Sequence, residues 1–337
     1  ILVYNEQKIF FFQLANNSKL IYQNLNSKGI IKMASSSSKN RIKGALAASL
    51  TAFKNDLSLD VSLTTEHGMN LLNEGLDGVV FFGTTGEGNS LSVIEKKAFI
   101  DHLRNEKFPL NKTMIGTGAC SLTDAVDLTN YSVNAGIYDC LVLPPFYYKN
   151  PKDDGLFAYF SEIIQRVAHK DLKIQIYHFP AVSQIPISHN LIEKLLKHYP
   201  ENITGIKDSS GDLENMLTMC KNFDNFDVYA GSETYFLPVL NAGGAGTITA
   251  TGNITAKKCV ELYKGFIENS DSVDELQQEL TGERELLQKA CSSVGFSSGL
   301  KIIMSSLKND DQWKICRPPF ALSNDNIAKE VISIFKS

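Results

Sequence analysis

The chain has 337 residues, of which 43% are hydrophobic and 21% are charged. This balance excludes an intrinsically disordered or fibrous protein. The formal net charge of −4 argues against a nucleic acid as the main partner, because phosphate binding needs a basic surface. Six cysteines lie far apart and form no C-x-x-C pair, which favours reduced, mostly buried thiols over a disulfide framework or a zinc site.

The charges are distributed unevenly along the chain. Residues 1–43 contain seven Lys or Arg and one acidic residue, so they carry +6 and leave −10 for residues 44–337. Met33, followed by Ala-Ser-Ser-Ser-Ser, has the form of a natural start. One hypothesis makes residues 1–32 a translated leader, and another makes the basic, Ser-containing stretch part of an organellar transit peptide. We expect residues 1–43 to lie outside the fold, and a cytoplasmic location unless the stretch directs the protein to an organelle.

From residue 44 onward, short apolar runs alternate with longer amphipathic stretches. Eight runs have the length of strands and are almost continuously apolar, which is typical of parallel strands covered on both faces. These runs are residues 44–50, 78–82, 113–116, 138–143, 173–177, 203–206, 226–230 and 246–250. No apolar stretch approaches the roughly 18 residues that a membrane span needs, so no membrane partner is expected.

Helical signals lie between the apolar runs. Ser92 and Glu95 have the spacing of a capping box that opens a helix. Residues 123–135 carry apolar side chains at helical spacing and stop before Gly136, and residues 188–199 are amphipathic and end before Pro200. Eight strand–helix units predict a (β/α)8 barrel, with a doubly wound open sheet as the alternative.

The expected organisation has three parts. Residues 1–43 form the leader or extension and residues 44–254 form the barrel. Residues 255–337 add helical stretches, including residues 273–290, and no clear strand. The fold class is therefore an α/β protein, a (β/α)8 barrel with a C-terminal helical extension.

Polar residues follow several of the predicted strands. In a (β/α)8 barrel the catalytic groups lie at the carboxyl ends of the strands. The second strand leads into residues 83–88 (GTTGEG), where glycines allow the backbone to approach a ligand closely and two hydroxyls could bind a carboxylate. The alternative interpretation is a plain glycine turn between a strand and a helix.

Tyrosines follow the fourth and fifth predicted strands. Residues 143–149 (LPPFYYK) contain Tyr147 and Tyr148, and residues 174–180 (IQIYHFP) contain Tyr177. A phenol at the end of a barrel strand is well placed to relay a proton. Packing in an interface or in the core is the alternative interpretation of each tyrosine.

Lys207 follows the sixth apolar run, within residues 203–211 (ITGIKDSSG). Lysine is rarely buried, and burial without a partner favours the neutral amine. A neutral amine can attack a ketone and form a Schiff base. The alternative is a lysine paired with Asp208 or another acid nearby. No H-E-x-x-H or G-x-S-x-G pattern occurs, so we expect no metal and no nucleotide cofactor.

Together, these segments resemble the dihydrodipicolinate synthase and N-acetylneuraminate lyase superfamily of pyruvate-type class I aldolases. The resemblance runs from about Gly44 to Phe320, with the pieces in one consistent order. It rests on residues 83–87 (GTTGE), 145–148 (PFYY), Tyr177 followed by Pro180, 205–208 (GIKD) and 317–319 (RPP). No single motif is decisive, but the ordered set is specific.

The resemblance implies a role for each of these residues. Lys207 would form the Schiff base with a 2-oxo acid, and Tyr177 would relay protons. The substrate carboxylate would be bound by Thr84 and Thr85 in the turn after Gly83. Tyr148, in preference to Tyr147, would complete the relay by reaching across a subunit contact in a homotetramer. Gly205 and Ile248 would line the pyruvate pocket. No cofactor is implied beyond the covalent Schiff base.

Departures from the resemblance concern the substrate. A dihydrodipicolinate synthase usually carries an arginine at the position of Val182, where it would bind the second substrate's carboxylate. Residues 231–234 (GSET) keep one of the two acids found in sialic acid lyases. We expect an aldolase or lyase that acts on pyruvate and an aldehyde. The alternatives are dihydrodipicolinate synthase itself, a Schiff-base sugar-acid dehydratase, and a non-catalytic barrel that binds 2-oxo acids.

Overall fold

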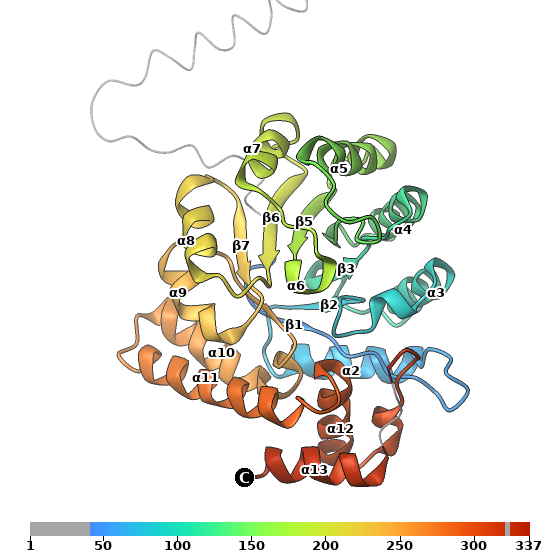
Figure 1. Cartoon of the computed structure of the whole chain (residues 1–337), viewed down its shortest axis with the longest axis vertical. Helices are drawn as coiled ribbons and strands as arrows, with labels where there is room; N and C mark the ends of the chain where they lie inside the picture. Colours follow the sequence, from blue (N-terminus) through green and yellow to red (C-terminus); the bar gives the residue numbers. More distant parts are fainter. Residues whose placement is uncertain (1–40, 321–323) are drawn as a thin grey trace, which may run out of the picture. The chain divides into compact units, whose positions relative to one another are not determined.

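The computed structural model describes residues 41–320 and 324–337. Eight parallel strands form a closed barrel in sequence order, and β1 pairs with β8 (Figure 1). The strands are β1 Gly44–Ala48, β2 Gly78–Phe81, β3 Thr113–Gly116, β4 Asp139–Val142, β5 Lys173–His178, β6 Ile203–Asp208, β7 Asp227–Ala230 and β8 Gly246–Thr249. The predicted (β/α)8 barrel is confirmed, and the bounds of each predicted strand differ from the observed ones by at most two residues.

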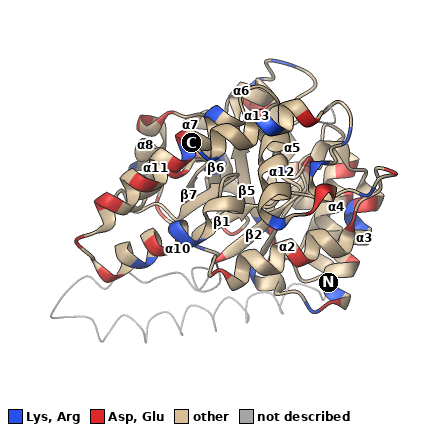
Figure 2. Ribbon diagram, turned by 90° about the horizontal axis from the view of Figure 1, so that it is seen from below, with Lys and Arg blue, Asp and Glu red and all other residues tan. Residues whose placement is uncertain are grey.

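The helices cover the outside of the barrel and extend beyond it (Figure 1). They are α2 Val61–Asn73, α3 Val93–Asn105, α4 Leu122–Asn134, α5 Asp153–Val167, α6 Pro180–Ser183, α7 His189–His198, α8 Leu213–Asn222, α9 Phe236–Asn241, α10 Gly252–Glu268, α11 Val273–Ala290, α12 Phe296–Lys308 and α13 Asp325–Phe335. The predicted capping box opens α3, where Ser92 and Glu95 bond to each other's backbone amides. Acidic and basic residues are interspersed along the outer helices (Figure 2).

Apolar side chains stabilise the barrel both inside it and between its strands and helices. The inner layer fills the barrel with side chains from alternate strand positions, among them Leu46, Val80, Met114, Tyr229 and Ile248. The outer layers lie between the strands and the helices. Successive strand residues point to opposite faces, so both faces of every strand are buried, and this explains the continuous apolar runs in the sequence.

The C-terminal helices join the barrel at its carboxyl end. Leu50 and Ala52, which follow β1, share one apolar cluster with residues of α11, α12 and α13. Helix α10 spans residues 252–268, so it crosses the boundary expected after residue 254. The C-terminal part therefore continues from the last barrel helix without an intervening linker.

The amino-terminal end of the barrel is covered by residues 41–43, which we expected to belong to the leader. Arg41 is buried, and its Nη1 donates to the carbonyl oxygen of Asn225 (2.7 Å) and lies 3.4 Å from Asp227 Oδ2. Ile42 joins the inner apolar layer and accepts a hydrogen bond from the Tyr229 hydroxyl. Residues 41–43 therefore belong to the folded barrel, and the rest of the expected leader lies outside the described residues.

The described residues also bear on the expectations about cysteines, membrane helices and metal sites. All six cysteines are free, and four of them are buried. Within residues 41–320 and 324–337, no helix is long and apolar enough to cross a bilayer. In the same ranges, no group of three or more His, Cys, Asp or Glu side chains is arranged to hold a metal ion.

Candidate functional site

Lys207 and Tyr177 are direct neighbours at the carboxyl end of the barrel. Their strands β6 and β5 pair in parallel, with Tyr177 opposite Lys207 in the register. Both side chains are 4% exposed. Lys207 Nζ lies 3.5 Å from the Tyr177 hydroxyl and 4.5 Å from the centre of the Tyr177 ring. The strand pairing therefore places an amine and a phenol within proton-transfer distance in a site largely shielded from water.

Thr84 extends this pair into a group of three. Its Oγ1 lies 3.3 Å from the Tyr177 hydroxyl, although Thr84 belongs to the turn after β2 and Tyr177 to β5. Thr85 is next to it and buried. The phenol thus lies between an amine on one side and a hydroxyl on the other, which is the geometry of a short proton relay.

A pocket at the carboxyl end opens onto this group. Its lining residues come from the ends of β2 to β5 and the turns that follow them: Phe82, Gly83, Thr84, Asn89, Gly116, Gly118, Leu141, Leu143 and Tyr177. The lining combines aliphatic and aromatic side chains with three glycines and the polar side chains of Thr84, Asn89 and Tyr177, around a cavity of about 20 Å³. Asn89 and Gly118 were not singled out from the sequence. A Gly-Thr-Gly run after the third strand, residues 116–118, was the available signal for Gly118.

The glycines of residues 83–88 have two different functions. A Cβ on Gly83 would meet no atom within 4 Å, so this glycine faces the open pocket. A Cβ on Gly88 would lie 2.0 Å from the Phe82 carbonyl oxygen, and one on Gly86 would lie 2.7 Å from the Ser49 carbonyl oxygen. The ligand-approach interpretation therefore applies to Gly83, whereas the later two glycines allow the turn to pack against the barrel.

Asp208 does not pair with Lys207. Adjacent strand residues point to opposite faces, and the two Asp208 carboxylate oxygens accept hydrogen bonds from the Ser210 amide and from Asn215 Nδ2. His178 likewise faces away from the site, and its Nδ1 accepts from the Ile187 amide. Burial lowers the pKa of His178. The structure thus assigns these two polar neighbours to the packing outside the barrel.

Tyr148 is not close to the other predicted residues within this chain. It lies on the loop between β4 and α5, with its side chain 81% exposed, and packs edge to face on Tyr147 at 5.2 Å. Both tyrosines therefore present large apolar rings to the surface beside the mouth of the barrel.

Gly205 and Ile248 lie in the interior of the barrel but not in the lining of the pocket. A Cβ on Gly205 would lie 2.3 Å from Gln175 Oε1, so the space over this glycine is filled. Ile248 is fully buried in the inner apolar layer. Both residues face the inside of the barrel and support the site from there.

The single acid retained after the seventh strand is also not available to a ligand. Glu233 is fully buried, and its carboxylate binds Thr251, Thr255 and Arg284. Arg284 lies on α11, so Glu233 connects the end of β7 to the C-terminal helices. Glu233 therefore has a structural role.

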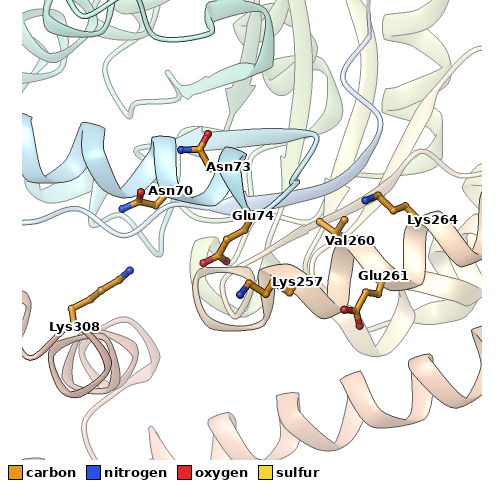
Figure 3. Close-up of a pocket in the computed structure, with 8 residues that line it drawn as sticks. All are labelled: Asn70, Asn73, Glu74, Lys257, Val260, Glu261, Lys264 and Lys308. Carbon is orange, nitrogen blue, oxygen red and sulfur yellow. The ribbon is translucent and has the colours of Figure 1, made fainter.

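A wider groove lies outside the barrel, between α2, α10 and the end of α12 (Figure 3). Its volume is about 540 Å³, and its lining includes Lys257, Lys264 and Lys308 together with Glu74 and Glu261. None of the predicted site residues lines it. Its charged side chains are exposed on the surface, whereas the smaller pocket is lined by Thr84 and by the buried Tyr177.

A closed parallel barrel with a buried lysine beside a tyrosine at its carboxyl end has the architecture of a (β/α)8-barrel enzyme. The chain belongs to the dihydrodipicolinate synthetase family, whose model matches residues 41–337. It is 30% identical to an uncharacterized DapA-like lyase of Chloroflexus aurantiacus, over 85% of this chain and 94% of the relative.

Two further relatives agree with this assignment. A 4-hydroxy-tetrahydrodipicolinate synthase of Prochlorococcus marinus is 28% identical over 87% of this chain and 94% of its own length. The crystal structure of dihydrodipicolinate synthase from Agrobacterium tumefaciens superposes with a TM-score of 0.77 at 27% identity, covering 87% of this chain and 99% of that one.

Proposed function

We propose that the protein is a class I aldolase that makes or breaks a carbon–carbon bond between pyruvate and an aldehyde through a Schiff base on Lys207. The observation that carries the proposal is the buried Lys207 amine 3.5 Å from the Tyr177 hydroxyl. Membership of the dihydrodipicolinate synthetase family supports it.

The chemistry follows from the positions of these groups. The neutral amine attacks the C2 carbonyl carbon of the 2-oxo acid, and loss of water from the carbinolamine leaves an iminium. In the cleavage direction, the hydroxyl on the carbon that becomes the aldehyde gives its proton to the relay of Tyr177 and Thr84. The iminium accepts the electron pair of the breaking carbon–carbon bond, the aldehyde leaves, and an enamine forms. Protonation of the enamine and hydrolysis then release pyruvate and regenerate the amine.

Tyr177 and the threonine turn have separate roles in this scheme. The Tyr177 hydroxyl, between Lys207 Nζ and Thr84 Oγ1, moves protons to and from the carbinolamine oxygen. The Thr84 and Thr85 hydroxyls and the amides of their turn bind the substrate carboxylate. Lys207, Tyr177 and Thr85 are all buried, so the reacting atoms are shielded from bulk solvent except for the water that the hydrolysis step consumes.

Val182 bears on the choice of aldehyde. It lies on α6, which directly follows β5, and is 53% exposed. An isopropyl side chain at this place offers no charged partner to a second carboxylate, which favours an aldehyde other than aspartate semialdehyde. The exposed Tyr147 and Tyr148 at the mouth support a homotetramer in which these rings are covered by another subunit.

Reductive trapping tests the proposal. Borohydride added with pyruvate should attach one reduced pyruvate to Lys207, as located by peptide mass mapping. Lys207→Ala should form no adduct and lose turnover while it remains folded, because the amine beside the Tyr177 hydroxyl is removed. Lys149→Ala is a matched control, since Lys149 is also at the barrel mouth but donates to the Phe146 carbonyl oxygen. No adduct, or an adduct on another lysine, would contradict the proposal.

A further inference from the structure

A second buried lysine forms an ion pair directly behind the substrate turn. Lys301 on α12 lies 2.5 Å from Glu87 Oε1, and neither side chain has any exposed surface. Glu87 closes the turn that carries Thr84 and Thr85, whereas Lys301 belongs to the C-terminal helical part. Nothing in the proposed reaction uses either residue.

The remaining bonds of the pair all come from the C-terminal part. Glu87 Oε2 accepts from the Arg317 amide (3.0 Å), and Lys301 Nζ also donates to the Ile315 carbonyl oxygen (2.6 Å). Lys301 Nζ lies 4.5 Å from the centre of the Phe53 ring. Both charges are therefore compensated in a dry environment, which is the condition under which a buried ion pair is tolerated.

The backbone of Glu87 transmits this anchoring to the site. Its amide donates to the Thr84 carbonyl oxygen (3.1 Å), and the following amide, of Gly88, donates to the Gly83 carbonyl oxygen (3.0 Å). Glu87 has a left-handed backbone with φ of 53°, a conformation that costs a non-glycine residue free energy. The carboxylate bonds offset this cost and fix the place from which Thr84 faces Tyr177.

We propose that Glu87 is a positioning residue for substrate binding: held by Lys301 and Arg317, it orients the Thr84–Glu87 turn toward the carboxylate of the 2-oxo acid. The C-terminal helices thereby set the affinity of a site to which they contribute no lining residue. This inference rests on the proposed function of Thr84 and Lys207. Replacing a buried pair by apolar groups is often neutral for stability, so a role in positioning can be separated from a role in folding.

The test measures the pyruvate concentration that gives half-maximal borohydride trapping, together with the melting temperature. Glu87→Gln keeps the size of the side chain and removes its charge. We expect it to raise the half-saturating pyruvate concentration about tenfold, as for the loss of one charge-assisted hydrogen bond, with trapping at saturating pyruvate retained. If Glu87→Gln does not fold, the double variant Glu87→Gln/Lys301→Met, which leaves no unpaired charge, carries the same test.

Glu95→Gln is the matched control. Glu95 pairs with the Arg317 guanidinium, so this variant also weakens the contact with the C-terminal part, but Glu95 makes no bond to the substrate turn. It should lower the melting temperature and leave the half-saturating concentration unchanged. Lys301→Arg, which keeps the charge beside Glu87, should retain most of the wild-type affinity.

The outcomes distinguish this inference from the proposed function. If the wild-type protein is trapped normally and the Glu87 variants lose only stability, the positioning role alone is overturned. Wild-type protein that is not trapped at all would overturn both, because the inference rests on the Schiff base.

Discussion

At the scale of single residues, the chemistry of a buried lysine depends on whether it forms an ion pair. Lys301 and Lys207 are both buried. Lys301 is held by Glu87, whereas Lys207 contacts a phenol. Burial alone therefore does not distinguish a reactive lysine from a structural one; the chemistry of the neighbouring group does.

His67 gives a prediction about pH. It is buried beside Trp313, and its Nε2 lies 2.7 Å from Asn253 Oδ1. Asn253 Oδ1 also accepts from the Leu50 amide, so the His67 nitrogen donates. Burial lowers the pKa of His67 to about 4, despite this hydrogen bond.

The sign of the pH effect follows from this lowered pKa. Between pH 6.5 and 4 the unfolded chain binds a proton at His67 that the folded chain excludes, so stability is present above pH 6.5 and is lost as the pH falls. The loss is about 3 kcal/mol, since one pKa unit corresponds to about 1.4 kcal/mol. His67→Gln keeps a donor but does not titrate, so its free energy of unfolding, measured in urea, should fall less steeply. Parallel pH curves for the two proteins would contradict this.

At the scale of the elements, the turn after β2 packs more tightly than a turn usually does. Gly88→Ala would place a methyl group 2.0 Å from the Phe82 carbonyl oxygen, so the backbone must shift. We expect a loss of about 2–3 kcal/mol, as for overpacking in a core, measured by urea unfolding. Gly83→Ala, in the same turn but with open space around it, should change stability by less than about 1 kcal/mol. Equal losses would show that the turn is not limited by packing.

The strands and their last residues could be predicted because each strand is specified by residues that are close together in the sequence. A parallel strand buried on both faces is a continuous apolar run, and its last polar residues stand out against it, as Lys207 and Tyr177 do. The contact between these two could not be derived from periodicity, because it depends on the register of β5 against β6.

Other parts of the site depend on contacts distant in sequence. Glu87 and Lys301 are 214 residues apart, and the only local signal was a lysine inside the apolar run of α12, residues 299–304. The boundary of the expected leader rests on the distribution of charge, and on that basis Arg41 belongs to the leader. In the structure, however, Asp227 in the barrel neutralises the charge of Arg41. The predicted role of Tyr148 requires a second chain, so neither local pattern nor this chain's own contacts can provide it.

At the scale of the whole molecule, the two ends of the barrel differ. The carboxyl end carries the pocket, the substrate turn and the cluster that joins the C-terminal helices. The amino-terminal end is closed by Arg41 and Ile42, with Tyr229 filling the space above them. The C-terminal part is therefore attached at the end where the chemistry is proposed to occur, and it stabilises that end through Glu87 and Glu233.

Among the described residues the pocket beside Tyr177 opens at the carboxyl end of the barrel, and the mechanism that we propose then predicts an ordered addition of the two substrates. On the proposed mechanism the 2-oxo acid must react first, because the aldehyde combines only with the enamine that forms on Lys207, and the aldehyde then follows through the same opening. An aldehyde that enters an empty barrel blocks the way to the amine. In the condensing direction, initial rates should fall at high aldehyde concentration and recover when pyruvate is raised; rates that do not depend on which substrate is in excess would contradict a single entrance.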